Sequence, residues 1–78
     1  MGQKMYQQKT IGQNIGVLRN KRNLTQEALA AKLQVHGCDI SRSALGKIEA
    51  GLRNIYATEL RALKEVLNVT YDELFDGI

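Results

Sequence analysis

Two predicted helices and the turn between them occupy residues 24–51, whose sequence is LTQEALAAKLQVHGCDISRSALGKIEAG. Thr25 is a favourable N-cap for the first of these helices, because its hydroxyl can accept a hydrogen bond from a free backbone N–H group. Leu24 and Leu29 have the spacing of a hydrophobic staple around that cap. Gly37 is a natural end for the helix, since glycine readily adopts the left-handed conformation that often follows one.

The second helix of this pair can begin at Asp39 or at Ser41. If Ser41 is its cap, Ile40 occupies the staple position before it, and Leu45 and Ile48 supply the buried stripe. The pattern therefore predicts two short helices that meet at an angle around a common core.

Three further helices are predicted, at about residues 11–22, 57–68 and 71–76. In the first two, apolar residues recur every three or four positions, which is typical of a helix with one buried face. Thr10 can cap the first, and Thr70 with Glu73 forms a capping box for the last. Their expected buried residues are Ile11, Ile15, Leu18, Leu60, Leu63, Val66 and Leu67.

The composition indicates one small globular domain. The chain has 78 residues, of which 44% are hydrophobic and 24% charged, and it contains no proline. Its single cysteine excludes an internal disulfide, and it has neither a secretory signal nor an apolar stretch of about 18 residues, so we expect a cytoplasmic protein that does not enter a membrane. We expect a compact all-α five-helix domain over residues 10–78, with a flexible polar arm at residues 1–9.

Charge is distributed unevenly along the chain, although the net charge is only +3. Nine basic and three acidic residues lie in residues 1–53, whereas two basic and five acidic residues follow them. A basic surface opposite an acidic one suits a protein that docks on a polyanion. Scattered, solvated charges are the alternative explanation.

Three segments resemble the lambda-repressor-like helix-turn-helix family, also called Cro/C1-type or Xre-like. They are LRNKRNLTQEALAAKL, SRSALGKIEAGLRN and VLNVTYDELF, and the resemblance extends over about residues 11–76. It implies a sequence-specific regulator of transcription, which we expect to be a repressor, bound as a homodimer to a double-stranded DNA operator. The helix-turn-helix itself would span about residues 25–51, and no cofactor or small-molecule substrate is implied.

The turn of this motif departs from the family pattern, because HGCDI at residues 36–40 adds about five residues. Without a gap, the alignment would put Ile40 and Ser43 in the two buried positions of the second helix, and Ser43 suits such a position poorly. A shift of five puts Leu45 and Ile48 there instead. We therefore interpret HGCDI as an insertion in the turn.

The second helix, at residues 41–50, is expected to enter the DNA major groove. The predicted base-reading residues are those of its first turn and one residue a turn further along: Ser41, Arg42, Ser43, Ala44 and Lys47. Arginine and lysine suit guanine O6 and N7, serine suits several base groups, and an alanine methyl suits the thymine methyl. A solvated basic face is the alternative. Gly46 is either a tolerated defect or a point where the helix backbone lies close to DNA.

Phosphate contacts are predicted at both ends of the motif. Thr25 and Gln26 lie at the start of the first helix, where free N–H groups favour an anion, although Thr25 is expected to act mainly as the cap. Arg53 and Asn54 follow the second helix and resemble the family's other phosphate contacts.

The resemblance also implies a structural ion pair between Arg19 and Glu49. A phosphate contact or a plain surface charge is the alternative for Arg19.

Other functions have weaker support in the sequence. His36, Cys38 and Asp39 lie close together, but structural zinc needs four ligands and the chain has no other His or Cys, so we expect no metal site. A redox role for Cys38 would need a depressed pKa. No nucleophile with a supporting base is evident, so we do not expect an enzyme.

A protein-interaction module or antitoxin on the same fold is the main rival, since fold alone does not fix function. Three apolar residues near the C-terminus, Tyr71, Phe75 and Ile78, either form the dimer interface or close the core.

Overall fold

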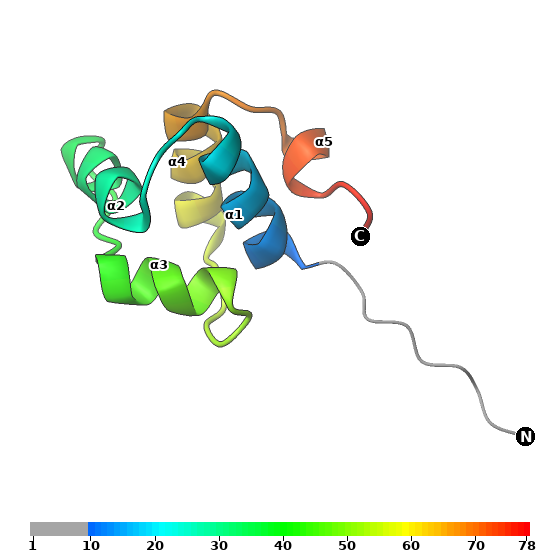
Figure 1. Cartoon of the computed structure of the whole chain (residues 1–78), viewed down its shortest axis with the longest axis horizontal. Helices are drawn as coiled ribbons and strands as arrows, with labels where there is room; N and C mark the ends of the chain where they lie inside the picture. The colour runs from blue at the N-terminus through cyan, green and yellow to red at the C-terminus, as the bar shows by residue number, and fades with distance from the viewer. Residues whose placement is uncertain (1–9) are drawn as a thin grey trace, which may run out of the picture.

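The computed structural model describes residues 10–78, which form five helices and no strand. The helices are α1 (Ile11–Lys21), α2 (Gln26–Val35), α3 (Arg42–Glu49), α4 (Ala57–Leu67) and α5 (Tyr71–Leu74). Figure 1 shows α3 along one edge of the domain, where it passes below α2 and the start of α1. The all-α, five-helix class expected from the sequence is confirmed, and the expected arm at residues 1–9 lies outside the described residues.

Hydroxyl caps set where four of the helices begin. The cap oxygens each accept a hydrogen bond from a backbone N–H three residues on, and they belong to Thr10, Thr25, Ser41 and Thr70. The alternatives for the start of the third helix are therefore resolved in favour of Ser41, whose Oγ lies 3.1 Å from the N atom of Ala44. Such caps satisfy N–H groups that have no partner within the helix.

Glycines end the two helices of the helix-turn-helix. Gly37 after α2 has a φ of +94°, and Gly51 after α3 has a φ of +76°, a region that other residues rarely adopt. In each case the next N–H reaches back to the last turn: Cys38 N lies 2.8 Å from Leu33 O, and Leu52 N lies 2.8 Å from Lys47 O. This is the Schellman pattern, in which the chain reverses while the helix carbonyls stay bonded.

One hydrophobic core joins all five helices. Its fully buried side chains are Ile15, Leu29, Leu33, Ile40, Leu45, Ile48, Leu63, Leu67 and Leu74. The inserted turn contributes Ile40, which has no exposed surface, whereas Val35 at the end of α2 is 90% exposed. Ile40 therefore anchors the start of α3 to the core, as its staple position predicts.

Helix α1 approaches α3 through a glycine. A Cβ atom on Gly12 would overlap the carbonyl oxygen of Ile48, and one on Gly16 would lie 3.1 Å from the Glu49 carboxylate. Only a residue without a side chain fits the first position, so the orientation of α3 depends directly on α1.

Side-chain hydrogen bonds to carbonyl groups hold the C-terminal helices. The buried Asn14 donates from Nδ2 to Leu74 O and to Asp76 O, each at 2.8 Å. Arg22 donates to the carbonyls of Leu67 and Asn68, at 2.9 and 3.0 Å, at the C-terminal end of α4. These bonds satisfy carbonyl groups that the ends of the helices leave unpaired.

The last two helices end earlier than the sequence pattern predicts. Asn68 adopts the left-handed conformation, with a φ of +55°, and so follows α4 instead of ending it. Helix α5 ends at Leu74, and the carbonyls of Leu74 and Asp76 accept hydrogen bonds from Asn14.

The three apolar residues near the C-terminus do not close the core. Tyr71, Phe75 and Ile78 are 42%, 43% and 61% exposed. They remain available for an interface. Within residues 10–78, no helix has the length and apolar character needed to cross a bilayer.

Candidate nucleic-acid interface

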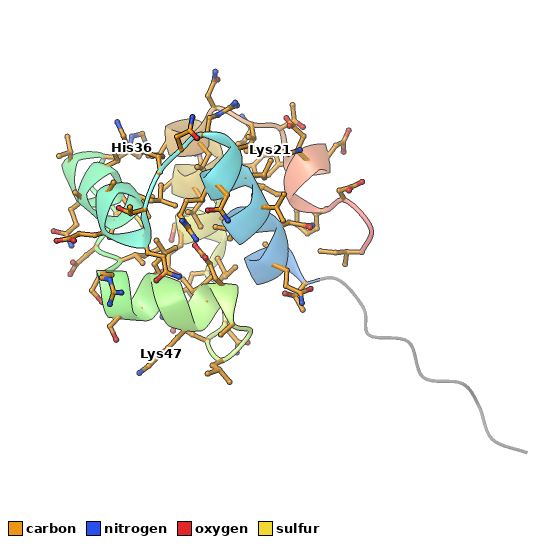
Figure 2. The ribbon with its side chains drawn as sticks, viewed as in Figure 1. Lys21, His36 and Lys47 are labelled. Carbon is orange, nitrogen blue, oxygen red and sulfur yellow. The ribbon has the colours of Figure 1, made fainter. Side chains whose placement is uncertain are left out.

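The outer face of α3 is polar and basic. Because Leu45 and Ile48 point into the core, the helical period turns Ser43 and Lys47 outward, and Arg42 lies beside them. All three are exposed, and within residues 10–78 their side chains make no hydrogen bond or ion pair. Figure 2 shows Lys47 projecting from α3 away from the rest of the domain. This face offers donors to an external ligand.

The other two predicted base-reading residues, Ser41 and Ala44, already make contacts within the domain. The Ser41 Oγ caps α3 by accepting from Ala44 N, which leaves its hydroxyl proton to donate. Ala44 is half-buried and packs against the hydrophobic core. The structure therefore places three of the five residues fully on the outer face and two at its margin.

Glu49 connects three helices behind that face. Its Oε2 lies 2.8 Å from Arg19 Nε and its Oε1 lies 3.0 Å from Arg19 Nη2, with side-chain exposures of 12% for Arg19 and 11% for Glu49. The hydrogen bond to Glu49 raises the pKa of the Arg19 guanidinium. Arg19 also donates to Leu24 O at 2.7 Å. The structure thus brings together the two residues for which the resemblance implies an ion pair.

Gln26 takes part in the same network. Its Nε2 donates to Glu49 Oε1 at 3.2 Å, which joins the start of α2 to the end of α3. A Cβ on Gly46 would lie 3.5 Å from Gln26 Oε1, in ordinary contact. The sequence does not predict the bond between Gln26 and Glu49. Its only related signal is Gly46 in the middle of α3, over which the Gln26 side chain lies.

At the start of α2, the two predicted phosphate-binding residues have different roles in the free protein. Thr25 is the cap, and its Oγ1 lies 3.0 Å from Ala28 N. The N–H groups of Gln26 and Glu27 have no acceptor within the helix. At this position they can donate to an anion, although the carboxylate of Glu27 opposes one there.

Arg53 forms a two-pronged ion pair with Glu59, for which the sequence predicts no role. Its two terminal nitrogens donate to the two oxygens of Glu59, each at 2.9 Å, and Nη1 also donates to Asn54 O. The hydrogen bond from Arg53 is the main reason that the pKa of Glu59 lies below its usual range. Glu59 also accepts from Tyr56 N at 3.0 Å, so it fixes both the loop after α3 and the start of α4.

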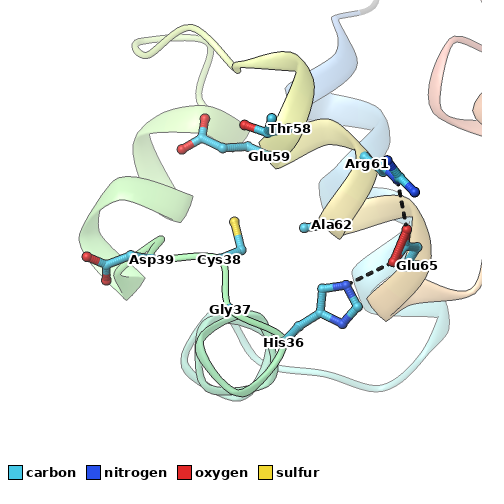
Figure 3. A pocket seen from close by; sticks show the side chains of 9 residues that line it. All are labelled: His36, Gly37, Cys38, Asp39, Thr58, Glu59, Arg61, Ala62 and Glu65. Carbon is cyan, nitrogen blue, oxygen red and sulfur yellow. Dashed lines mark hydrogen bonds and ion pairs between the residues drawn. The ribbon is translucent and has the colours of Figure 1, made fainter.

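The inserted turn forms a groove with α4, shown in Figure 3. His36 Nε2 lies 2.9 Å from Glu65 Oε2, and Arg61 donates to the other oxygen of Glu65 at 3.2 Å. The Cys38 side chain points into the groove and is half-buried, and this burial is the main cause that raises the pKa of its thiol. A raised pKa disfavours the thiolate, which argues against a redox role.

The part of the chain from residue 10 onward contains no cluster of three or more side chains suited to hold a metal.

Together, two packed helices joined by the turn at residues 36–41 and an exposed basic face on the second helix define a helix-turn-helix DNA-binding regulator. The chain belongs to the helix-turn-helix family, whose model matches residues 15–74. It is similar in structure to the restriction-modification controller protein C.AhdI from Aeromonas hydrophila, with a TM-score of 0.72 and 34% sequence identity over 83% of this chain and 87% of that chain. No curated protein matches the sequence. The resemblance stated from the sequence is thereby confirmed.

Proposed function

We propose that the protein is a sequence-specific regulator that represses transcription by placing α3 in the major groove of double-stranded DNA. The observation that carries this proposal is the outer face of α3, where Arg42, Ser43 and Lys47 are exposed without a partner in residues 10–78. A major groove about 12 Å wide admits a helix, and its base edges present the acceptors that such side chains need.

In this proposal, Arg42 and Lys47 donate to guanine O6 and N7, and Ser43 exchanges hydrogen bonds with a neighbouring base. The hydroxyl proton of Ser41 and the methyl of Ala44 act at the margin of the contact, because Ser41 also caps α3 and Ala44 also packs against the core. We expect each good bidentate contact to discriminate against a wrong base by about 1–3 kcal/mol.

Phosphate contacts would orient the helix in the groove. At the start of α2 they would come from the region of Thr25 and Gln26, where backbone N–H groups are free to donate. After α3 they would come from Arg53 and Asn54. Glu59 and the Asn54 carbonyl occupy both Nη1 protons and one Nη2 proton of Arg53, so the Nε proton and the other Nη2 proton are left for a phosphate oxygen.

A homodimer is part of the proposal, because two half-sites separated by one helical turn, about 34–36 Å, require two copies of α3. The exposed Tyr71, Phe75 and Ile78 are the proposed interface. Similarity to a restriction-modification controller supports a restriction-modification setting for this protein. A DNA-binding regulator of this kind would act in the cytoplasm.

A protein-interaction module or antitoxin is less well supported. Such a module has no need of unpaired basic side chains on the outer face of α3 next to free N–H groups at the start of α2. Selection of bound duplexes from a random library tests the proposal. We expect enrichment of a motif with two symmetric half-sites, whereas recovery of no motif would favour the rival function.

A further inference from the structure

The guanidinium group of Arg53 is held by three neighbours. Its Nη1 and Nη2 atoms donate to the two oxygens of Glu59, each at 2.9 Å, and Nη1 also donates to the carbonyl of Asn54 at 2.9 Å. Its Cζ lies over the ring of Tyr56, 5.9 Å from the centroid. This arginine, in the loop after α3, is therefore fixed before any ligand binds.

One edge of the same guanidinium stays free. An arginine has five N–H donors, and the contacts above use both protons on Nη1 and one on Nη2. Among residues 10–78, the Nε proton and the second Nη2 proton have no acceptor, and they lie parallel on one edge of the planar group. Arg19 uses that edge for Glu49, with its Nε and Nη2 atoms 2.8 and 3.0 Å from the two carboxylate oxygens. The free edge of Arg53 therefore suits two oxygens of one anion.

Glu59 is the more firmly placed partner of the ion pair. Its Oε1 also accepts from Tyr56 N at 3.0 Å, at the start of α4. Its side chain is 13% exposed, compared with 29% for Arg53, so an external anion can reach the arginine more easily than the carboxylate. Figure 1 shows the loop between α3 and α4 at the same edge of the domain as α3. The free edge of Arg53 thus belongs to the side of the domain that carries the proposed DNA-reading helix.

We propose that Glu59 is a positioning residue for the phosphate contact of Arg53: it holds one end of the guanidinium so that the Nε–Nη2 edge meets two oxygens of one DNA phosphate. This inference rests on the proposed DNA-binding function. A free arginine side chain loses rotamer entropy when it is ordered on a ligand, and a guanidinium that is already fixed avoids that loss. Because a phosphate contact reads no base, Glu59 contributes to affinity for every duplex and not to base preference.

The sign of the effect separates this role from simple electrostatics. A carboxylate near DNA repels phosphate, so the loss of its charge alone would strengthen binding. In Glu59→Gln, the amide oxygen can keep the bond from Tyr56 N, whereas the amide NH2 cannot accept from Nη2 of Arg53. Glu65→Gln is the matched control, because it removes the same charge from another α4 carboxylate that is paired with an arginine, Arg61.

The test measures affinity for the duplex selected by the wild-type protein and for a scrambled duplex, at several salt concentrations. Glu59→Gln should weaken binding to both duplexes by roughly 2- to 12-fold, the factor that corresponds to ordering one flexible side chain. Glu65→Gln should not weaken binding to either. Arg53→Met should weaken both by at least as much as Glu59→Gln and should lower the slope of log affinity against log salt by about 1.

The double variant shows whether Glu59 acts through Arg53. Adding Glu59→Gln to Arg53→Met should weaken binding no further, and urea unfolding establishes that each variant is folded under the assay conditions. The inference would be overturned if Glu59→Gln or Arg53→Met did not weaken binding, or if Glu59→Gln had the same effect in both backgrounds. Each of these results leaves DNA binding itself in place. Failure of the wild-type protein to bind any duplex would overturn the proposed function as well.

Discussion

Arg19 Nε on α1 and Glu49 Oε2 on α3 lie 2.8 Å apart, and both side chains are largely but not fully buried. The pair fixes the last turn of α3, and Gln26 of α2 bonds to the same carboxylate. The orientation of α3 relative to the rest of the domain therefore depends on polar contacts as well as on the core.

Removal of either partner of this pair should destabilise the protein strongly. Arg19→Met and Glu49→Leu should each lower the free energy of unfolding by about 3 kcal/mol, because each leaves a partly buried charge without its partner. The double variant should lose much less than the sum of the two. Urea unfolding of all four proteins measures the coupling, and additive losses would mean that the two residues do not act as a pair.

Gly12→Ala should destabilise the domain, because the new methyl group would overlap the backbone carbonyl of Ile48. We expect a loss of about 1–3 kcal/mol, as for other overpacked positions, measured by thermal or urea unfolding. An unchanged stability would contradict the close approach of α1 and α3.

Gly46→Ala should have the opposite effect on stability. Its methyl group would be in ordinary contact with Gln26, at 3.5 Å, and alanine favours a helix by about 1 kcal/mol over glycine. We also expect weaker binding to the selected duplex, because a side chain would obstruct close approach of the α3 backbone to DNA. Greater stability with unchanged affinity would leave the glycine without a role at the interface.

Within residues 36–40, Ile40 is the side chain that should contribute most to stability through burial. Ile40→Ala should cost about 2–5 kcal/mol, since the side chain is fully buried. Val35→Ala is the matched control at the end of α2, and its 90% exposure predicts a change within about 0.5 kcal/mol. Similar losses in the two variants would contradict the staple at the start of α3.

The fork between Arg53 and Glu59 predicts a dependence of stability on pH. The pKa of Glu59 is lowered by the hydrogen bond from Arg53, so its contribution is present above the unfolded-state pKa of about 4.3 and is lost as the pH falls through the lower folded-state value. The stability difference between the wild type and Glu59→Gln should therefore shrink on acidification below about pH 4.

Glu65→Gln provides the control for that experiment. The pKa of Glu65 is also lowered, by Arg61 first and then by His36, but the carboxylate is far more exposed and water screens it. Its variant should show a smaller dependence on pH. A constant difference for Glu59→Gln across this range would argue against the fork.

Local features of the fold could be predicted from the sequence. The hydroxyls of Thr10, Thr25, Ser41 and Thr70 and the two glycines after α2 and α3 act on backbone groups within a few residues, so their roles are encoded locally. The apolar spacing also favours the register in which Leu45 and Ile48 are buried.

Contacts between distant segments could not be predicted in the same way. The bonds from Gln26 to Glu49, from His36 to Glu65 and from Asn14 to the carbonyls near α5 depend on how the helices pack. Arg53 could be singled out as a cation after α3, but its partner Glu59 depends on the path of the intervening loop. The base-reading and phosphate-binding roles themselves stay predictions.

Binding of duplex DNA at several salt concentrations tests the central claim most directly. The wild-type protein should bind the selected duplex more tightly than a scrambled one, with an affinity that falls steeply as salt rises, because phosphate contacts release counterions. Lys47→Ala should weaken binding and remove part of the preference without loss of fold. An absence of measurable binding to any duplex at low salt would contradict the account.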